Sequence, residues 1–158
     1  MGGRKVVVAL SGGVDSSVAA LLAREAGDEV VAATLDMTPE DPAWRAAWSC
    51  GGDAREAVAA IVGKLGIEHH VLRCYDRFAE RVLRPCYEEY AAGRTPNPCC
   101  RCNPEVKFGI LLDFAREIGA ERLLTGHYAR LNADHMIERG EIKRSEEHTS
   151  ELQSLAYL

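Results

Sequence analysis

The sequence has no apolar run long enough to cross a membrane and no excess of basic residues. A membrane-spanning helix needs roughly 20 predominantly apolar residues, whereas a run such as Val6 to Leu10 is far shorter. No apolar signal segment follows Met1, so we expect a cytoplasmic protein that makes no membrane contact. Lys and Arg total 19 against 24 Asp and Glu. Any contact with RNA must therefore use a local basic patch rather than the bulk charge.

The absence of a secretion signal also changes how the six cysteines are interpreted. In such a chain they are expected to be reactive or metal-binding rather than to form a disulfide framework. The 158 residues fit one domain, and a hydrophobic content of 47% is enough for one core. A fully disordered chain is thereby excluded.

Short apolar runs alternate with helical patterns over the first 130 residues or so, as a parallel α/β sheet requires. Strands are predicted at Lys5–Leu10, Glu29–Leu35, Glu68–Arg73 and Arg122–Thr125. Helices are predicted at Asp15–Ala26, Asp53–Leu65, Arg77–Ala92 and Val106–Ile118. Each of these helices is followed by a glycine, which is typical of a left-handed C-terminal cap.

The tail differs from this pattern. Residues 144–154 read RSEEHTSELQS, with neither strand alternation nor an apolar helical face. The string resembles the in-frame translation of a sequencing-library adapter. We therefore expect an ATP-binding domain over residues 1–143 and a non-native tail over residues 144–158, with a natural polar tail as the alternative.

A glycine-rich loop follows the first strand and reads SGGVDSS from Ser11 to Ser17. A strand, a glycine turn and a helix start form an anion site, because backbone N–H groups converge there and the helix dipole adds positive potential. The loop lacks the lysine of the Walker pattern and is not the dinucleotide fingerprint. The serines are candidate hydroxyl donors to phosphate.

SGGVDS resembles the loop of the ATP pyrophosphatases, a family that cleaves ATP between the α and β phosphates. The resemblance implies a parallel-sheet, HUP-like (Rossmann-like) α/β domain and ATP as the nucleotide. Asp15, in the first helical turn, suits Mg²⁺ beside polyphosphate, with helix capping as the structural alternative. The nucleotide contacts expected are Ala9, Leu10, Ser11, Gly12, Gly13, Val14, Asp15, Ser16, Leu35 and Gly126.

The last two of these residues follow from the sheet topology, because ligands of doubly wound sheets bind at the carboxyl ends of strands. Leu35 ends the second strand, and Gly126 follows the fourth within TGHY. Gly126 could bring its amide to the nucleotide. His127 could face the substrate, although a purely structural role is also open.

The cysteine segment, Gly93 to Phe108, reads GRTPNPCCRCNPEVKF and is predicted to be a stiff loop that presents thiols. Cations at Arg94, Arg101 and Lys107 would lower the pKa of a nearby thiol if they lie close to it. Together with SGGVDSS and TGHY, the segment resembles the tRNA 2-thiouridylases over residues 5 to 130.

That resemblance implies a tRNA substrate and places the nucleophile on Cys102. It places contacts with the target base on Asn97, Pro98 and Cys99. Two sulfur routes stay open: a persulfide that Cys102 resolves as a disulfide, or an iron–sulfur cluster on Cys99, Cys102 and a third cysteine. Zinc is a third use of the C-x-x-C pair.

The family's second catalytic cysteine and its tRNA-binding domains are expected beyond this chain, which should therefore be inactive alone. A sulfur-donor protein, either a cysteine desulfurase or a relay protein, is the expected partner. Cys50 and Cys100 have no assigned role, Cys74 and Cys86 are interpreted as small apolar residues, and His69 and His70 need no special role. The rival interpretations are another ligase of the same superfamily, such as a GMP or NAD synthetase, and a non-catalytic metal-binding or RNA-binding module.

Overall fold

A five-stranded sheet organises the chain. The computed structural model describes residues 3–41, 54–127, 129–131, 137–139 and 155–157. The sheet has the order β3-β2-β1-β4-β7, and its first four strands are parallel. These strands are β1 (Lys5–Ala9), β2 (Glu29–Asp36), β3 (Glu68–Arg73) and β4 (Arg122–Leu124). The predicted parallel α/β sheet is confirmed.

The remaining strands lie after β4. Strand β7 (Leu155–Tyr157) pairs antiparallel with β4 at the edge of the sheet, and β5 (Ala129–Leu131) pairs with β6 (Ile137–Arg139) in a separate hairpin. Strand β7 lies within the segment that the sequence suggests is adapter-derived, whereas the rest of that segment, and the predicted helix start at Asp53, lie outside the described residues.

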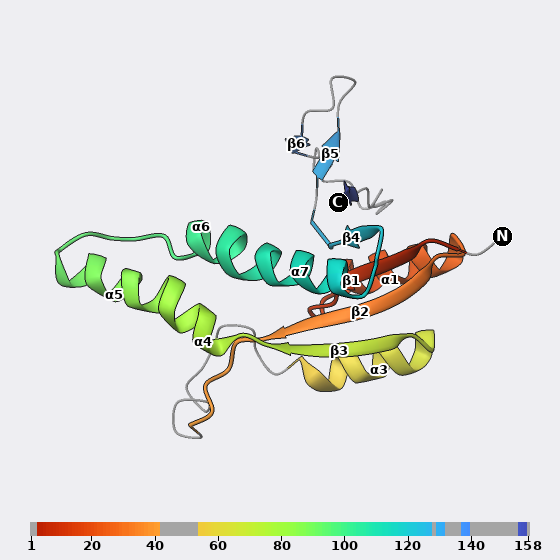
Figure 1. Cartoon of the computed structure of the whole chain (residues 1–158), viewed down its shortest axis with the longest axis horizontal. Coiled ribbons are helices and arrows are strands. Elements are labelled where there is room, and N and C mark those ends of the chain that lie inside the picture. Colours follow the sequence, from red (N-terminus) through yellow and green to blue (C-terminus); the bar gives the residue numbers. More distant parts are fainter. Residues whose placement is uncertain (1–2, 42–53, 128, 132–136, 140–154, 158) are drawn as a thin grey trace, which may run out of the picture.

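Helices cover both faces of the sheet and bury its central strand. Val6, Val7 and Val8 of β1 are each 0% exposed, as expected for a central parallel strand that is covered on both faces. Helices α1 (Val14–Glu25) and α3 (Arg55–Leu65) pack on the face that carries Val6 and Val8. Helix α7 (Gly109–Glu117) packs on the opposite face, against Val7. The result is a three-layer α/β architecture (Figure 1).

The predicted helix ends are confirmed at all four glycines. Each has a positive φ, a conformation that only glycine adopts without strain. The values are 83° at Gly27, 60° at Gly66, 74° at Gly93 and 69° at Gly119. At each of these four positions the chain reverses direction after a helix, and the reversal uses a single glycine.

A helical arm extends past the sheet between β3 and α7 (Figure 1). It contains α4 (Tyr75–Phe78), a π-helical segment η1 (Ala79–Leu83) and α5 (Arg84–Ala91). After a non-helical connection it returns through α6 (Cys99–Cys102) and the π-helical segment η2 (Asn103–Phe108). The helix predicted at Arg77–Ala92 thus begins two residues earlier, at Tyr75.

The prediction that the cysteine segment is a loop is wrong beyond Pro98. Helix begins at Cys99, because Pro98 already has helical angles (φ −62°, ψ −26°) and the Asn97 side-chain oxygen accepts a hydrogen bond from the Cys99 N–H at 3.1 Å. Proline at the start of a helix loses nothing, since that N–H would have no helical partner. The predicted helix at Val106–Ile118 is therefore the end of a longer helical run.

Both π-helical segments adjoin a proline, Pro85 after η1 and Pro104 within η2. Proline lacks the N–H for the usual i−4 bond, and its ring clashes with the carbonyl four residues back. A widened turn relieves both problems without ending the helix. Among the described residues, no helix has the length and apolarity that a membrane span requires.

The buried position of Leu123 in β4 gives a test of the sheet. Leu123 is 0% exposed, whereas Leu22 on α1 is 43% exposed. Leu123→Ala should lower the free energy of unfolding by about 2–5 kcal/mol, because it leaves a cavity between β4 and α7. Leu22→Ala is the control and should change it by about 0.5 kcal/mol. Urea unfolding measures both, and equal effects would contradict this packing.

Candidate functional site

The glycine loop connects β1 to the N-terminus of α1, and its geometry requires glycine. Gly12 has φ +81°, and a Cβ there would lie 2.7 Å from the Ala54 Cβ. Gly13, not Asp15, occupies the N-cap position and brings no side chain to cap the helix. Asp15 therefore lies in the first turn of α1 and is not its N-cap residue. The first N–H groups of α1 lie at an open helix start where an anion can bind.

The serine hydroxyls stabilise the loop from within. Ser16, which is 4% exposed, donates from Oγ to the Gly13 carbonyl at 3.0 Å and accepts from the Ser11 N–H at 3.3 Å. Ser17 donates to the same carbonyl at 2.7 Å. In this structure these two hydroxyls shape the loop, whereas the sequence suggested them as phosphate donors.

A second layer of polar groups holds the end of β1. The Leu10 N–H donates to the Ala33 carbonyl at 2.8 Å, which continues the pairing with β2 past the strand. The Thr34 hydroxyl donates to the Leu10 carbonyl at 2.7 Å, and His69 Nε2 lies 2.9 Å from the same hydroxyl. The sequence gave His69 no role, because its partner is 35 residues away.

Gly126 brings the TGH motif against the glycine loop. A Cβ on Gly126 would lie 2.6 Å from the Ser16 nitrogen and 2.9 Å from the Asp15 carbonyl carbon. The backbone after β4 thus contacts the first turn of α1 directly. The two motifs are therefore close together, as the strand order predicted. Leu35, at the end of β2, is half-buried and packs against two clusters of the core.

His127 links the glycine loop region to the cysteine arm. Its Nδ1 lies 2.8 Å from the Thr125 hydroxyl, and its exposed ring has its centroid 5.8 Å from that of Phe108. Phe108 ends η2, the π-helical segment that directly follows Cys102. The three motifs are therefore linked by contacts within one region.

The thiols of the cysteine segment lie in different environments. Cys99 and Cys100 are exposed, whereas Cys102 is buried at 5% exposure against Phe78 and Val82. The C-x-x-C pair is therefore divided between solvent and core. In the described part of the chain no group of three His, Cys, Asp or Glu side chains could hold a metal ion.

Arg94, one of the cations that the sequence places near the thiols, pairs with a carboxylate instead. Its guanidinium donates from Nε to Glu89 Oε2 at 2.5 Å and from Nη2 to Oε1 at 2.9 Å. These hydrogen bonds from Arg94 lower the pKa of Glu89 and raise that of Arg94. The pair fixes the chain reversal after α5, so Arg94 serves the fold of the arm.

Cys74 shares the buried cluster of Cys102. Burial raises the pKa of the Cys74 thiol to about 11, and the charges of Asp36 and Cys102 add to this rise. The Cys74 Sγ lies 3.5 Å from the Asp36 carbonyl oxygen. The apolar environment predicted for Cys74 is confirmed. Its proximity to Cys102 escaped the sequence analysis, although its place just after a strand was a signal.

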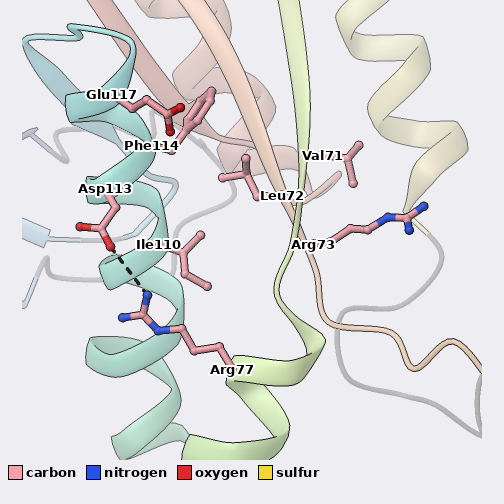
Figure 2. Close-up of a pocket in the computed structure, with 8 residues that line it drawn as sticks. All are labelled: Val71, Leu72, Arg73, Arg77, Ile110, Asp113, Phe114 and Glu117. Carbon is pink, nitrogen blue, oxygen red and sulfur yellow. Dashed lines mark ion pairs between the residues drawn. The ribbon is translucent and has the colours of Figure 1, made fainter.

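Two hollows on the surface lie apart from the glycine loop and the TGH motif. One, of about 350 Å³, runs between the edge strand β3 and α7, with the Arg77–Asp113 ion pair (3.7 Å) across it (Figure 2). Its lining residues are Val71, Leu72, Arg73, Arg77, Ile110, Asp113, Phe114 and Glu117. The other, of about 420 Å³, is lined by Arg77, Glu80, Arg81 and Glu105. Neither contains a predicted site residue.

The contact of Gly126 with α1 yields a direct test. Gly126→Ala places a methyl group against backbone atoms, which cannot yield cheaply, and should cost about 1–3 kcal/mol of stability. Gly63→Ala is the matched control, because a Cβ there meets nothing within 4 Å, and it should stabilise α3 by up to about 1 kcal/mol. Thermal unfolding distinguishes them, and a neutral Gly126→Ala would contradict the contact.

His69 is expected to make the free energy of unfolding sensitive to acid. Burial, and then the neighbouring His70, lower the pKa of His69 below its ordinary value. Protonation therefore favours the unfolded chain, so the stability that neutral His69 contributes is present above the unfolded pKa and is lost as pH falls through the folded one. NMR titration of the ring should show the lowered pKa, and His69→Gln should flatten the acid limb. An unshifted His69 would contradict its burial.

The family comparison covers nearly the whole described chain. The model described as "tRNA methyl transferase HUP domain" matches residues 4–155. The chain is 45% identical over 137 residues to the "tRNA-specific 2-thiouridylase MnmA" of Thermus thermophilus, which covers 80% of this chain and 37% of that protein. The protein of the same name from Nitratidesulfovibrio vulgaris is 48% identical over 127 residues, with 80% and 35% covered. The chain spans about a third of the length of these relatives.

Solved structures share the fold at low identity. One is the "predicted subunit of tRNA methyltransferase" from Methanocaldococcus jannaschii, with a TM-score of 0.54 at 20% identity over 84% of this chain and 60% of that one. A glutamine-dependent NAD+ synthetase from Acinetobacter baumannii has a TM-score of 0.52 at 16% identity over 78% and 21%. These likenesses show the fold alone. The extent of the family match and the identity to the relatives assign this chain to the tRNA methyl transferase HUP domain family.

Proposed function

We propose that this chain is the ATP-binding portion of a tRNA 2-thiouridylase, a sulfurtransferase. The contact of Gly126 with Asp15 and Ser16 is the observation that carries the proposal, because it unites the loop of the ATP pyrophosphatases with TGH. The names of the relatives supply the acceptor, a tRNA. The Phe108–His127 contact then connects this nucleotide region to the cysteine arm.

The first step is adenylation of the wobble uridine. The N–H groups of Gly13 and the first turn of α1 bind the phosphates of ATP while the C2 oxygen of the base attacks the α-phosphorus. The bond to pyrophosphate breaks, and pyrophosphate leaves with its electron pair. A carbonyl oxygen is a poor leaving group until it is esterified in this way. Asp15 offers the oxygen ligand that Mg²⁺ prefers, and the ion would neutralise the polyphosphate charge.

The second step replaces the activated oxygen with sulfur. A persulfide sulfur attacks C2, and AMP leaves with the former C2 oxygen. Cys102 then attacks the sulfur of the second catalytic cysteine, which the resemblance places outside this chain. The S–S bond to the base breaks, 2-thiouridine leaves with its sulfur, and the two cysteines form a disulfide. Because Cys102 is 5% exposed, tRNA binding must open its cluster. The proposed contacts with the substrate are four exposed residues, Asn97, Pro98, Cys99 and His127.

The described residues favour the persulfide route over a metal centre. Cys99 and Cys102, the proposed cluster ligands, lie on opposite sides of the boundary between solvent and core. No third ligand among the described residues completes such a set. The group does not fit this arrangement, and we derive no step through an iron–sulfur cluster or zinc.

A cysteine desulfurase or relay protein would supply the persulfide in the cytoplasm. Residues 1–143 form the ATP-pyrophosphatase domain, and residues 144–158 are an adapter-derived tail, which sequencing of the genomic locus would test. The chain alone should make no 2-thiouridine when given ATP, tRNA and a sulfur donor, and its detection by mass spectrometry would overturn this expectation.

Calorimetry tests the nucleotide site. The chain should bind Mg²⁺-ATP, and Asp15→Asn should weaken binding by about tenfold, or about 1.4 kcal/mol, because it removes the ionic ligand. Cys102→Ser is the matched control, since it changes the sulfur step and should leave ATP binding unaltered. No ATP binding by the folded chain would favour a non-catalytic module.

The acceptor separates the proposal from a related ligase. Pyrophosphate release by a full-length protein of this family should depend on tRNA. Stimulation by XMP or a deamido-dinucleotide in place of tRNA would favour a GMP or NAD synthetase.

A further inference from the structure

Cys102 points into the protein rather than toward the solvent that its neighbours meet. It is 5% exposed and lies in a cluster with Met37, Cys74, Phe78, Val82 and Val106. Cys99 and Cys100, on the same helical turn, are exposed. The sequence spacing alone would pair Cys102 with Cys99, but burial separates those two thiols.

Cys74 approaches the cluster from the carboxyl end of β3. It is also 5% exposed, and it occupies the N-cap of α4. Its N–H donates to the Asp36 carbonyl at 2.9 Å, which fixes its backbone against β2. Cys74 and Cys102 belong to the same cluster of buried side chains. Burial, and then the charges of Asp36 and Cys102, raise the pKa of Cys74 to about 11.

The other described cysteines lack this placement. Cys86 on α5 is half-buried and is not in the cluster, and Cys99 and Cys100 face solvent. The cluster therefore selects one partner for Cys102 among the described cysteines. The two residues are far apart in sequence, and they meet in the buried cluster that also contains Phe78 and Val82.

We propose that Cys74 and Cys102 form a buried dithiol site that a small hydroperoxide oxidises to an internal disulfide. The Cys102 thiolate attacks the peroxide oxygen, the O–O bond breaks, and water leaves after protonation, which yields a sulfenic acid on Cys102. The Cys74 sulfur then attacks the Cys102 sulfur, the S–O bond breaks, and a second water leaves. Two thiols and one hydrogen peroxide thus give one disulfide and two waters.

This disulfide would remove the Cys102 thiol from sulfur transfer and would protect it from irreversible oxidation. A thiol reductant would restore both thiols. The loss of sulfur transfer rests on the proposed function. The disulfide itself rests only on the cluster, so the two can fail separately.

Peptide mapping tests the pair directly, because trypsin separates the relevant cysteines. Cleavage after Arg and Lys puts Cys74 in CYDR, Cys102 in CNPEVK, and Cys99 with Cys100 in TPNPCCR. The native chain is treated with stoichiometric hydrogen peroxide, its remaining thiols are alkylated under denaturing conditions, and the digest is examined by mass spectrometry. CYDR linked to CNPEVK should be the main disulfide and should disappear on reduction with dithiothreitol.

Variants and a denatured sample complete the test. Cys86→Ala, the matched control, should leave this link intact, whereas Cys74→Ala should abolish it and leave Cys102 as a sulfenic or sulfinic acid. Circular dichroism confirms that each variant is folded. The proposal is overturned if Cys102 links mainly to TPNPCCR, if it stays reduced while Cys99 and Cys100 oxidise, or if the chain in guanidinium gives the same distribution of links. The wild-type map decides the matter even if Cys74→Ala fails to fold.

Discussion

Strand β1 has hydrogen-bonded neighbours on both sides, and the rest of the structure depends on this central place. With β2 on one side and β4 on the other, the three carboxyl ends meet at one edge. The glycine loop, Leu35 and Gly126 are therefore neighbours by topology, before any side chain is considered. The buried valines hold β1 between two helical layers, and this packing fixes the position of the glycine loop at the end of the strand.

The arm places polar and reactive groups outside the buried sheet. Its helices contain prolines that would normally end them, and the widened turns at η1 and η2 let the chain continue. Cys102 can in consequence occupy a helix that is packed on one side and open on the other. The arm remains tied to the nucleotide region through Phe108 and His127.

The sequence predicted what local patterns can encode. Apolar runs of strand length, helical periodicity and terminal glycines located all four parallel strands, and β3 agreed to the residue. The sequence also predicted the structure around the loop motif, because a strand, a glycine turn and a helix are local features. The cysteine segment was predicted incorrectly because three prolines suggest a loop, while a proline at a helix start and another at a π-helical turn are compatible with helix.

The features that remained hidden are contacts between distant residues. Thr34 and His69 join β2 to β3, and Cys74 meets the cluster of Cys102, with no periodicity to reveal either. Side-chain direction was also inaccessible, because a C-x-x-C spacing does not say which thiol faces the core. Burial, decided by the packing of α6 against η1, supplied that information.

The hydrogen bonds behind the loop also have a direction. Thr34 has a single hydroxyl proton, and it donates that proton to the Leu10 carbonyl. The hydroxyl oxygen can then only accept from His69, so Nε2 must carry the ring proton. Acid would add its proton at Nδ1 and leave the Nε2–H donor in place. The support beneath the glycine loop is thus independent of the charge on the imidazole, even where that charge weakens the fold as a whole.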